Sequence, residues 1–146
     1  INISNFKYSS KKIKVFGMDA TKKKSYKNFL KKINISKNEQ YFDIIIDDGS
    51  HKLEDILNAL KLYFKNLKLN GFYIIEDYKM PNFFKHLNTT KEPKINKFID
   101  LVKKKKTFNS NILNKNFQKT FFKDVRSIKA YHGIYKISDI VFFKKN

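Results

Sequence analysis

The residues of this chain with the clearest chemical potential follow an apolar run at residues 42–46, FDIII. Asp47 and Asp48 come directly after the run, and His51 follows three residues later. Burial explains the isoleucines, but carboxylates and an imidazole gain nothing from an apolar core. These polar residues are therefore expected to act where a strand ends.

A second apolar run, GFYIIED at residues 71–77, ends in Glu76 and Asp77. Neighbouring parallel strands would carry both acidic pairs and His51 to one edge of a sheet, where α/β proteins bind ligands. Crowded carboxylates repel one another unless a cation lies among them. Oxygen ligands in a chain without cysteine favour a hard ion such as Mg²⁺.

His51 can reach the same space from the start of the next helix. An imidazole exchanges protons near neutral pH, so we expect His51 to act as a general base. A purely structural role, in which His51 caps or packs the first helical turn, remains the alternative. Asp47 and Asp48 could likewise form a polar strand end, but the matching pair Glu76 and Asp77 favours a site.

The elements that must position these residues alternate between strands and helices. Apolar spacing predicts strands at 13–16, 42–46 and 71–77, and helices at 25–33 and 53–67. Ser25 and Ser50 are the expected N-caps, and Asn70 with Gly71 is expected to end the second helix. This order predicts an α/β fold, a Rossmann-like and mostly parallel sheet.

The rest of the chain is less regular, and a single domain over 1–146 is expected. Residues 78–94 contain both prolines and predict a loop or lid, and the whole of 78–125 is interpreted as a lid or acceptor-side insertion. A helix is expected from residue 95 to 102. Residues 127–133 and 136–145 predict a closing antiparallel hairpin.

The series FDIIIDDGSH, helix, LKLNGFYIIED closely resembles the class I S-adenosylmethionine-dependent methyltransferases of the macrocin and mycinamicin sugar O-methyltransferase type. The resemblance covers residues 13–77 and extends to the terminal hairpin. It implies a Mg²⁺-assisted transfer of a methyl group to a hydroxyl of a sugar or another small molecule. The implied acceptor is thus a small hydroxylated molecule.

The resemblance also implies roles for individual residues. His51 would be the catalytic base, Asp47 would lie beside the methionine end of S-adenosylmethionine, and the GMDA turn would lie near its adenine. The implied Mg²⁺ ligands are Asp48, Glu76 and Asp77, and the implied cofactor contacts of the turn are Met18, Asp19 and Ala20. As a residue in a turn, Asp19 also has a structural alternative.

The family's glycine-rich cofactor loop is missing from this sequence. The four glycines, at 17, 49, 71 and 133, include no G-x-G pattern. The family's loop and its first strands would precede residue 13, so we interpret the chain as a C-terminal fragment and expect it to be inactive alone. Reading the sequence upstream of Ile1 would test this interpretation.

The formal net charge of +19 favours a second class of function, a non-catalytic nucleic-acid-binding domain that uses its lysines. Two features weaken it, because Arg126 is the only arginine and the lysines are spread along the chain. A methyltransferase acting on nucleic acid is disfavoured because no N-P-P-Y signature occurs. No run approaches a membrane span, and the lack of cysteine fits a cytoplasmic protein.

Other candidates have weaker support. His86 and His132 show no partner in the sequence and are interpreted as structural. The phenylalanine pairs at 83–84 and 121–122 could line an acceptor pocket, although aromatic pairs more often belong to a core.

Overall fold

The computed structural model describes residues 12–135 and 137–146, and it contains four strands and several helices in those ranges. The elements are α1 (Lys23–Lys32), β1 (Phe42–Asp47), α2 (Leu53–Tyr63), the 3-10 turn η1 (Phe64–Asn66), β2 (Leu67–Ile75), α3 (Met80–Phe83), η2 (Lys85–Leu87), α4 (Ile95–Lys103), α5 (Lys115–Asp124), β3 (Val125–Tyr131) and β4 (Ile140–Lys145).

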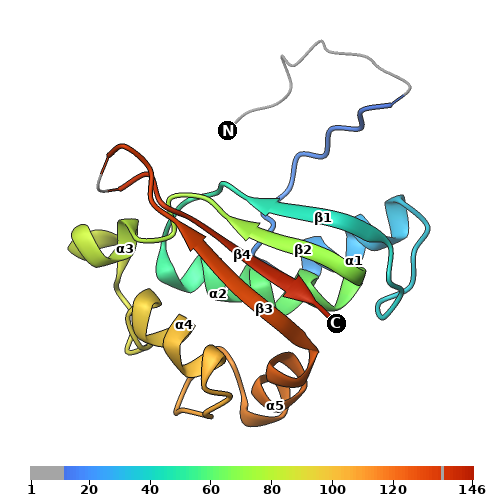
Figure 1. Cartoon of the computed structure of the whole chain (residues 1–146). Coiled ribbons are helices and arrows are strands. Elements are labelled where there is room, and N and C mark those ends of the chain that lie inside the picture. The colour runs from blue at the N-terminus through green and yellow to red at the C-terminus, as the bar shows by residue number, and fades with distance from the viewer. Residues whose placement is uncertain (1–11, 136) are drawn as a thin grey trace.

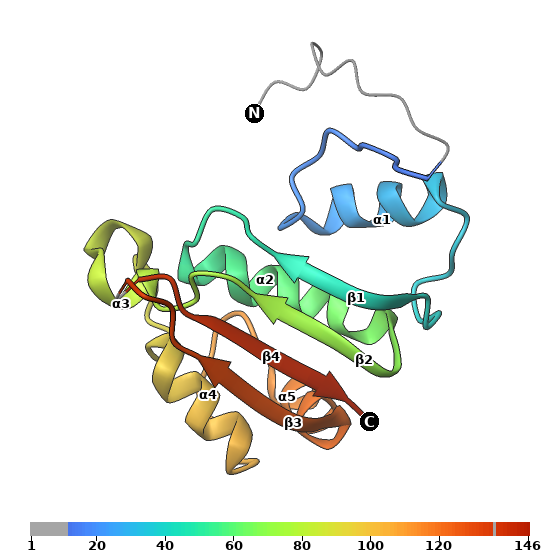
Figure 2. The same ribbon diagram turned by 45° about the horizontal axis from the view of Figure 1, so that its top comes forward.

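The four strands form one mixed sheet in the order β1-β2-β4-β3 (Figure 2). β1 and β2 are parallel neighbours, as predicted, with α2 between them in the chain. β4 runs antiparallel to β2, and β3 runs antiparallel to β4, which confirms the terminal hairpin. The expectation of a mostly parallel sheet was wrong for the described residues, because only one of the three strand pairs is parallel.

The helices α2, α4 and α5 lie on one face of the sheet (Figures 1 and 2). Their apolar sides pack on inward-facing strand residues such as Tyr73 and Phe143, both almost fully buried. Ile44 and Ile46 alternate with the inward-facing Ile45 and point to the opposite face, where they are 56% and 58% exposed. The core therefore lies between one sheet face and one helical layer.

The strand predicted at residues 13–16 is absent. These residues have no regular secondary structure and belong to no sheet, and Ile13 and Val15 are about half exposed. β-forming residues are stable as a strand only with a partner that supplies backbone hydrogen bonds and a packing surface. No described strand provides that partner.

The helix limits also differ from expectation. α1 begins at Lys23 after Lys22, so Ser25 lies inside the helix and is not its cap. α2 begins at Leu53, and its N-cap Lys52 forms no side-chain cap. Ser50 instead donates a hydrogen bond of 2.5 Å to Asp55, a carboxylate in the first turn of α2.

Asn70 and Gly71 do not end a helix; they lie inside β2, which starts at Leu67. Asn70 has a left-handed φ of 63°, and the register between β1 and β2 shifts at this point. A Cβ on Gly71 would lie 2.8 Å from the carbonyl oxygen of Asp43 in β1. The turn signal is therefore real, but it marks an irregularity in a strand.

Residues 78–125 contain more structure than a lid. α3 and η2 occupy part of 78–94, while α4 agrees with the helix predicted from residue 95. α5 was missed. Phe98 of α4 and Phe121 and Phe122 of α5 are nearly inaccessible to solvent, so the 121–122 pair belongs to the core, whereas Phe83 and Phe84 are exposed.

Asn66 connects α1 to the main core. Its side chain is fully buried, accepts a 2.6 Å hydrogen bond from the Tyr26 hydroxyl, and donates to the carbonyl oxygens of Lys37 and Glu39. We expect Asn66→Ala to lower the free energy of unfolding by about 2–4 kcal/mol, because several buried polar groups lose their partners. Urea denaturation of this variant, with the exposed Asn96→Ala as control, measures the effect; equal losses would contradict it.

Across residues 12–135 and 137–146, no helix has the length and apolar character needed to cross a bilayer.

Candidate active site

The carboxyl ends of β1 and β2 meet at one edge of the sheet. Asp47 pairs with Ile75 in the parallel register, and the amide of Glu76 donates a 3.0 Å hydrogen bond to the carbonyl oxygen of Asp47. The backbone thus places the residues after β1 beside those after β2, as the sequence predicts. The next turn bends away, because Asp77 has a left-handed φ of 47°.

Asp47 is the most electrostatically perturbed carboxyl group of this edge. Burial raises its pKa from 3.8 to about 6, and hydrogen bonds from the Tyr73 hydroxyl and the Gly49 amide oppose that rise. The Tyr73 hydroxyl lies 3.3 Å from Asp47 Oδ2. Perturbed carboxyl groups of this kind are concentrated at functional sites.

His51 stands at the entrance to α2 with a left-handed φ of 54°. Its Nε2 atom lies 3.8 Å from Asp48 Oδ1. The His51 side chain is 21% exposed and that of Asp48 is 62% exposed, so this pair faces solvent. The imidazole is therefore accessible to a molecule that approaches the sheet edge, and it does not fill the core.

A cavity of about 530 Å³ joins these residues to the turn before α1. Its walls include all four residues that were predicted to contact the cofactor, together with the predicted base: Met18, Asp19, Ala20, Asp47 and His51. Segments 18–20 and 47–51 are distant in sequence, and the fold brings them to one concave space. Cavities of this size at the carboxyl ends of strands are the usual binding sites of α/β proteins.

The turn at the far wall of the cavity is held by Asp19. Its Oδ1 atom accepts hydrogen bonds from the Thr21 hydroxyl at 2.7 Å and from the Thr21 amide at 2.9 Å. These bonds lower the pKa of Asp19, the hydroxyl bond having the larger effect. Asp19 thus fixes the turn and still presents an ionised, acceptor-only group.

The predicted Mg²⁺ ligands do not form a metal site in the part of the chain that the structure describes. In the described ranges, no three His, Cys, Asp or Glu side chains are grouped closely enough to hold a metal. The chemistry of the donors nevertheless fits Mg²⁺, because Asp48, Glu76 and Asp77 provide carboxylate oxygens. Although the chain is rich in lysine, no ion pair joins these three carboxylates to a lysine or arginine of the described chain.

Two features of the edge were missed by sequence reasoning. Tyr73 was assigned only to a strand, although its hydroxyl reaches Asp47. His132, interpreted as lacking a partner, lies 3.2 Å from the buried carboxylate of Asp139, which also pairs with Lys79. The period-two pattern of β2 could have placed Tyr73 on the inner face, but no local pattern links residue 79 to residues 132 and 139.

Neither a protein-family model nor a curated protein matches this chain. Solved structures match it in fold. The MycE methyltransferase from the mycinamycin biosynthetic pathway, in complex with Mg and SAH, aligns with 94% of the chain at a TM-score of 0.61 and 16% sequence identity. The fold is that of part of MycE. A MycE complex that also contains mycinamycin VI aligns with a TM-score of 0.63 and 17% identity.

The chain spans about a third of the length of MycE, since the two alignments cover 34% and 33% of that protein. The resemblance drawn from the two acidic motifs is thereby confirmed at the level of the fold. The identity is too low for MycE to assign individual residues in this chain.

Proposed function

We propose that this chain is part of a Mg²⁺-assisted, S-adenosylmethionine-dependent O-methyltransferase that acts on a hydroxyl of a sugar or another small molecule. The observation that carries the proposal is the cavity at the carboxyl edge, which is lined by Asp19, Asp47 and His51 and adjoins the paired ends of β1 and β2. The fold shared with MycE supports it, because the MycE structures contain Mg and SAH.

His51 is the base in this proposal. The acceptor O–H bond breaks as the proton passes to His51 Nε2, the nitrogen that faces Asp48. The deprotonated acceptor oxygen would then be the nucleophile toward a methyl group. When bound, the cofactor supplies an electrophilic methyl group on a sulfonium, and the protein mainly positions it.

The carboxylates have separate roles. Asp48, Glu76 and Asp77 would hold Mg²⁺, which lowers the pKa of a coordinated hydroxyl when it is bound. Asp47 faces the cavity and, when ionised, would attract the positive methionine end of the cofactor. Asp19 holds the turn that would contact the adenine end, with Met18 and Ala20 beside it.

Titration calorimetry of Mg²⁺ into the complete natural protein tests the proposal. Asp48→Asn and Glu76→Gln are each expected to weaken Mg²⁺ binding at least about tenfold, because each removes a charged ligand. Asp43→Asn is the control, since Asp43 lies at the opposite end of β1 and pairs with Lys68 at 3.0 Å. Unchanged Mg²⁺ affinity in both site variants would refute the metal assignment.

A further inference from the structure

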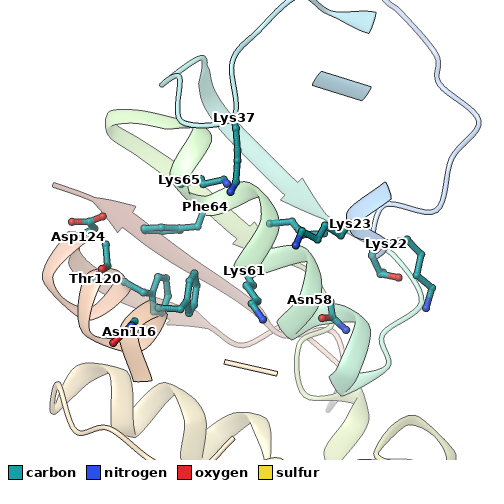
Figure 3. A pocket seen from close by; sticks show the side chains of 14 residues that line it. Lys22, Lys23, Lys37, Asn58, Lys61, Phe64, Lys65, Asn116, Thr120 and Asp124 are labelled. Atoms are coloured by element: carbon teal, nitrogen blue, oxygen red, sulfur yellow. The ribbon is translucent and has the colours of Figure 1, made fainter. Parts of the chain in front are cut away.

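A second cavity, which we call the lysine pocket, lies between the start of α1, the loop after α1, α2 with η1, and α5 (Figure 3). Its volume is about 680 Å³. Five lysines from these segments line it: Lys22, Lys23, Lys37, Lys61 and Lys65. Among the described residues of its wall, Asp124 is the only acidic one, so this lining carries a formal charge of +4.

The positive charge of the lysine pocket is not balanced from within. None of the ion pairs in the described ranges involves any of the five lysines. Asp124 acts on another cation, because it raises the pKa of the buried Lys145, which burial lowers. Lys145 itself donates to the carbonyl oxygens of Lys65 and Leu67.

The pKa of Lys65 reflects the repulsion between the ammonium groups of the lysine pocket. Its pKa is lowered to about 8, mainly by burial and also by the charges of Lys37 and Lys23, with no opposing contribution from a carboxylate. Its Nζ atom lies 5.3 Å from the centre of the Tyr26 ring. In Figure 3 the amino groups of Lys37 and Lys65 point toward one another above Phe64. Such an arrangement is costly unless an anion joins it.

The walls of the lysine pocket are firmly packed. Phe64 and Phe121 are 2% and 1% exposed and meet edge to face, with ring centres 4.7 Å apart. Asn66 fixes the backbone of Lys37 through its hydrogen bond to the carbonyl oxygen of that residue. The lysines therefore extend from a rigid frame, which limits the entropy lost when they close on a ligand.

We propose that the lysine pocket binds a small phosphorylated molecule that carries two or more negative charges, of the polyphosphate or nucleoside-polyphosphate class. Lysine ammonium groups bind phosphate as point charges, and a polyphosphate concentrates enough charge to match several of them. A monocarboxylate would leave most of the lysines unmatched. The volume lies in the range of small-molecule sites, which favours such a ligand over an extended nucleic acid.

The lysine pocket is distinct from the candidate active site. The two cavities share only Thr21 and Lys22. The active-site cavity is lined by Asp19, Asp47 and Asp55, which repel anions, so a polyphosphate is expected to choose the lysine pocket. The proposal therefore does not depend on methyl transfer.

Calorimetry with inorganic tripolyphosphate, at near-physiological salt, tests the proposal on this chain and on the complete natural protein. The double variant Lys37→Gln/Lys65→Gln is expected to weaken binding by about tenfold to a hundredfold, because each lysine offers a charge-assisted hydrogen bond. The control, Lys104→Gln/Lys106→Gln, removes the same charge from the exposed segment that follows α4 and is expected to change the affinity less than about threefold.

Chemical footprinting gives a second readout that needs no variant. The lowered pKa of Lys65 should make its amine react early with an acylating reagent, and tripolyphosphate should protect it. Equal weakening in both double variants, or labelling of Lys65 that ignores tripolyphosphate, would overturn the proposal. Tighter binding of single-stranded RNA or duplex DNA through the same two lysines would overturn the small-molecule ligand and favour a nucleic acid.

Discussion

Replacement of His51 by glutamine in the complete natural protein is expected to lower the rate of methyl transfer by about 10²–10⁴-fold, the range that positioned general bases contribute. Glutamine keeps a polar side chain of similar reach but cannot take a proton. His51 is 21% exposed and is not among the buried core residues, so the fold should persist. Single-turnover kinetics with saturating S-adenosylmethionine measure the chemical step directly.

His86→Gln is the matched control, since His86 lies exposed in η2 and does not line the active-site cavity. We expect it to retain the parental rate. The pH–rate profile of the parent is expected to contain a limb that reports a general base, and His51→Gln should lose that limb. A decrease of less than tenfold with the same pH profile would show that His51 is structural, the alternative left open by the sequence.

The sequence predicts those parts of the fold whose signal is local and strongly periodic. The apolar runs before Asp47 and Glu76 form the adjacent strands β1 and β2. The apolar spacing from residue 95 predicts a helix, which is α4, and the last two apolar stretches pair as the hairpin of β3 and β4. In each case the buried residues follow the period of the element that they form. In these elements, tertiary packing and the secondary-structure preference of the local sequence favour the same structure, and the prediction is confirmed.

The secondary-structure predictions are wrong where contacts with distant segments determine the local structure. Residues 13–16 have strand-forming side chains but no described strand beside them. Asn70 and Gly71 have the composition of a helix end, yet the close approach of the Asp43 carbonyl oxygen places them in β2. α5 was missed because polar residues separate its buried Gln118, Phe121 and Phe122 from other apolar positions. No single-sequence pattern reports such tertiary contacts.

The candidate site shows the same distinction: the sequence predicts the positions of its residues in the fold but not the contacts of their side chains. The motifs identify the residues that follow β1 and β2, and the parallel pairing brings their backbones together, as the bond from Glu76 to Asp47 shows. The gathering of carboxylate oxygens around a cation depends on side-chain rotamers and on the cation itself, and sequence fixes neither. The contact between Tyr73 and Asp47 joins residues 26 positions apart. Such second partners become visible only in the folded chain.

Asp47 has a predicted role in cofactor binding, and its ionisation is expected to lower the free energy of unfolding. Its pKa is raised by burial from 3.8 to about 6, so the folded chain holds this proton more tightly than the unfolded chain does. Stability from this group is therefore fully present below about pH 4 and is lost as the pH rises to about 6. The pKa difference corresponds to a loss on the order of 3 kcal/mol above that window.

Asp47→Asn is accordingly expected to raise the free energy of unfolding of the metal-free chain by about 1–3 kcal/mol above pH ~7, and to change it little near pH ~4. The amide oxygen of Asn can still accept the hydrogen bond from the Tyr73 hydroxyl. Urea denaturation in the presence of a chelator at both pH values measures the difference. Asp100→Asn, an exposed site on α4, is the control and should be close to neutral at both.

The same substitution should have the opposite effect on the proposed cofactor. In the complete protein, loss of the Asp47 charge is expected to weaken S-adenosylmethionine binding by about tenfold to a hundredfold, because a charge-assisted contact with its methionine end is lost. In the parent, affinity should rise as the pH passes through about 6 and Asp47 ionises. A variant that is more stable but binds the cofactor less tightly would identify Asp47 as a group kept for binding at the expense of stability. Greater stability with unchanged cofactor affinity would show that Asp47 does not contribute to cofactor binding. Its burial would then be only a structural feature of the end of β1.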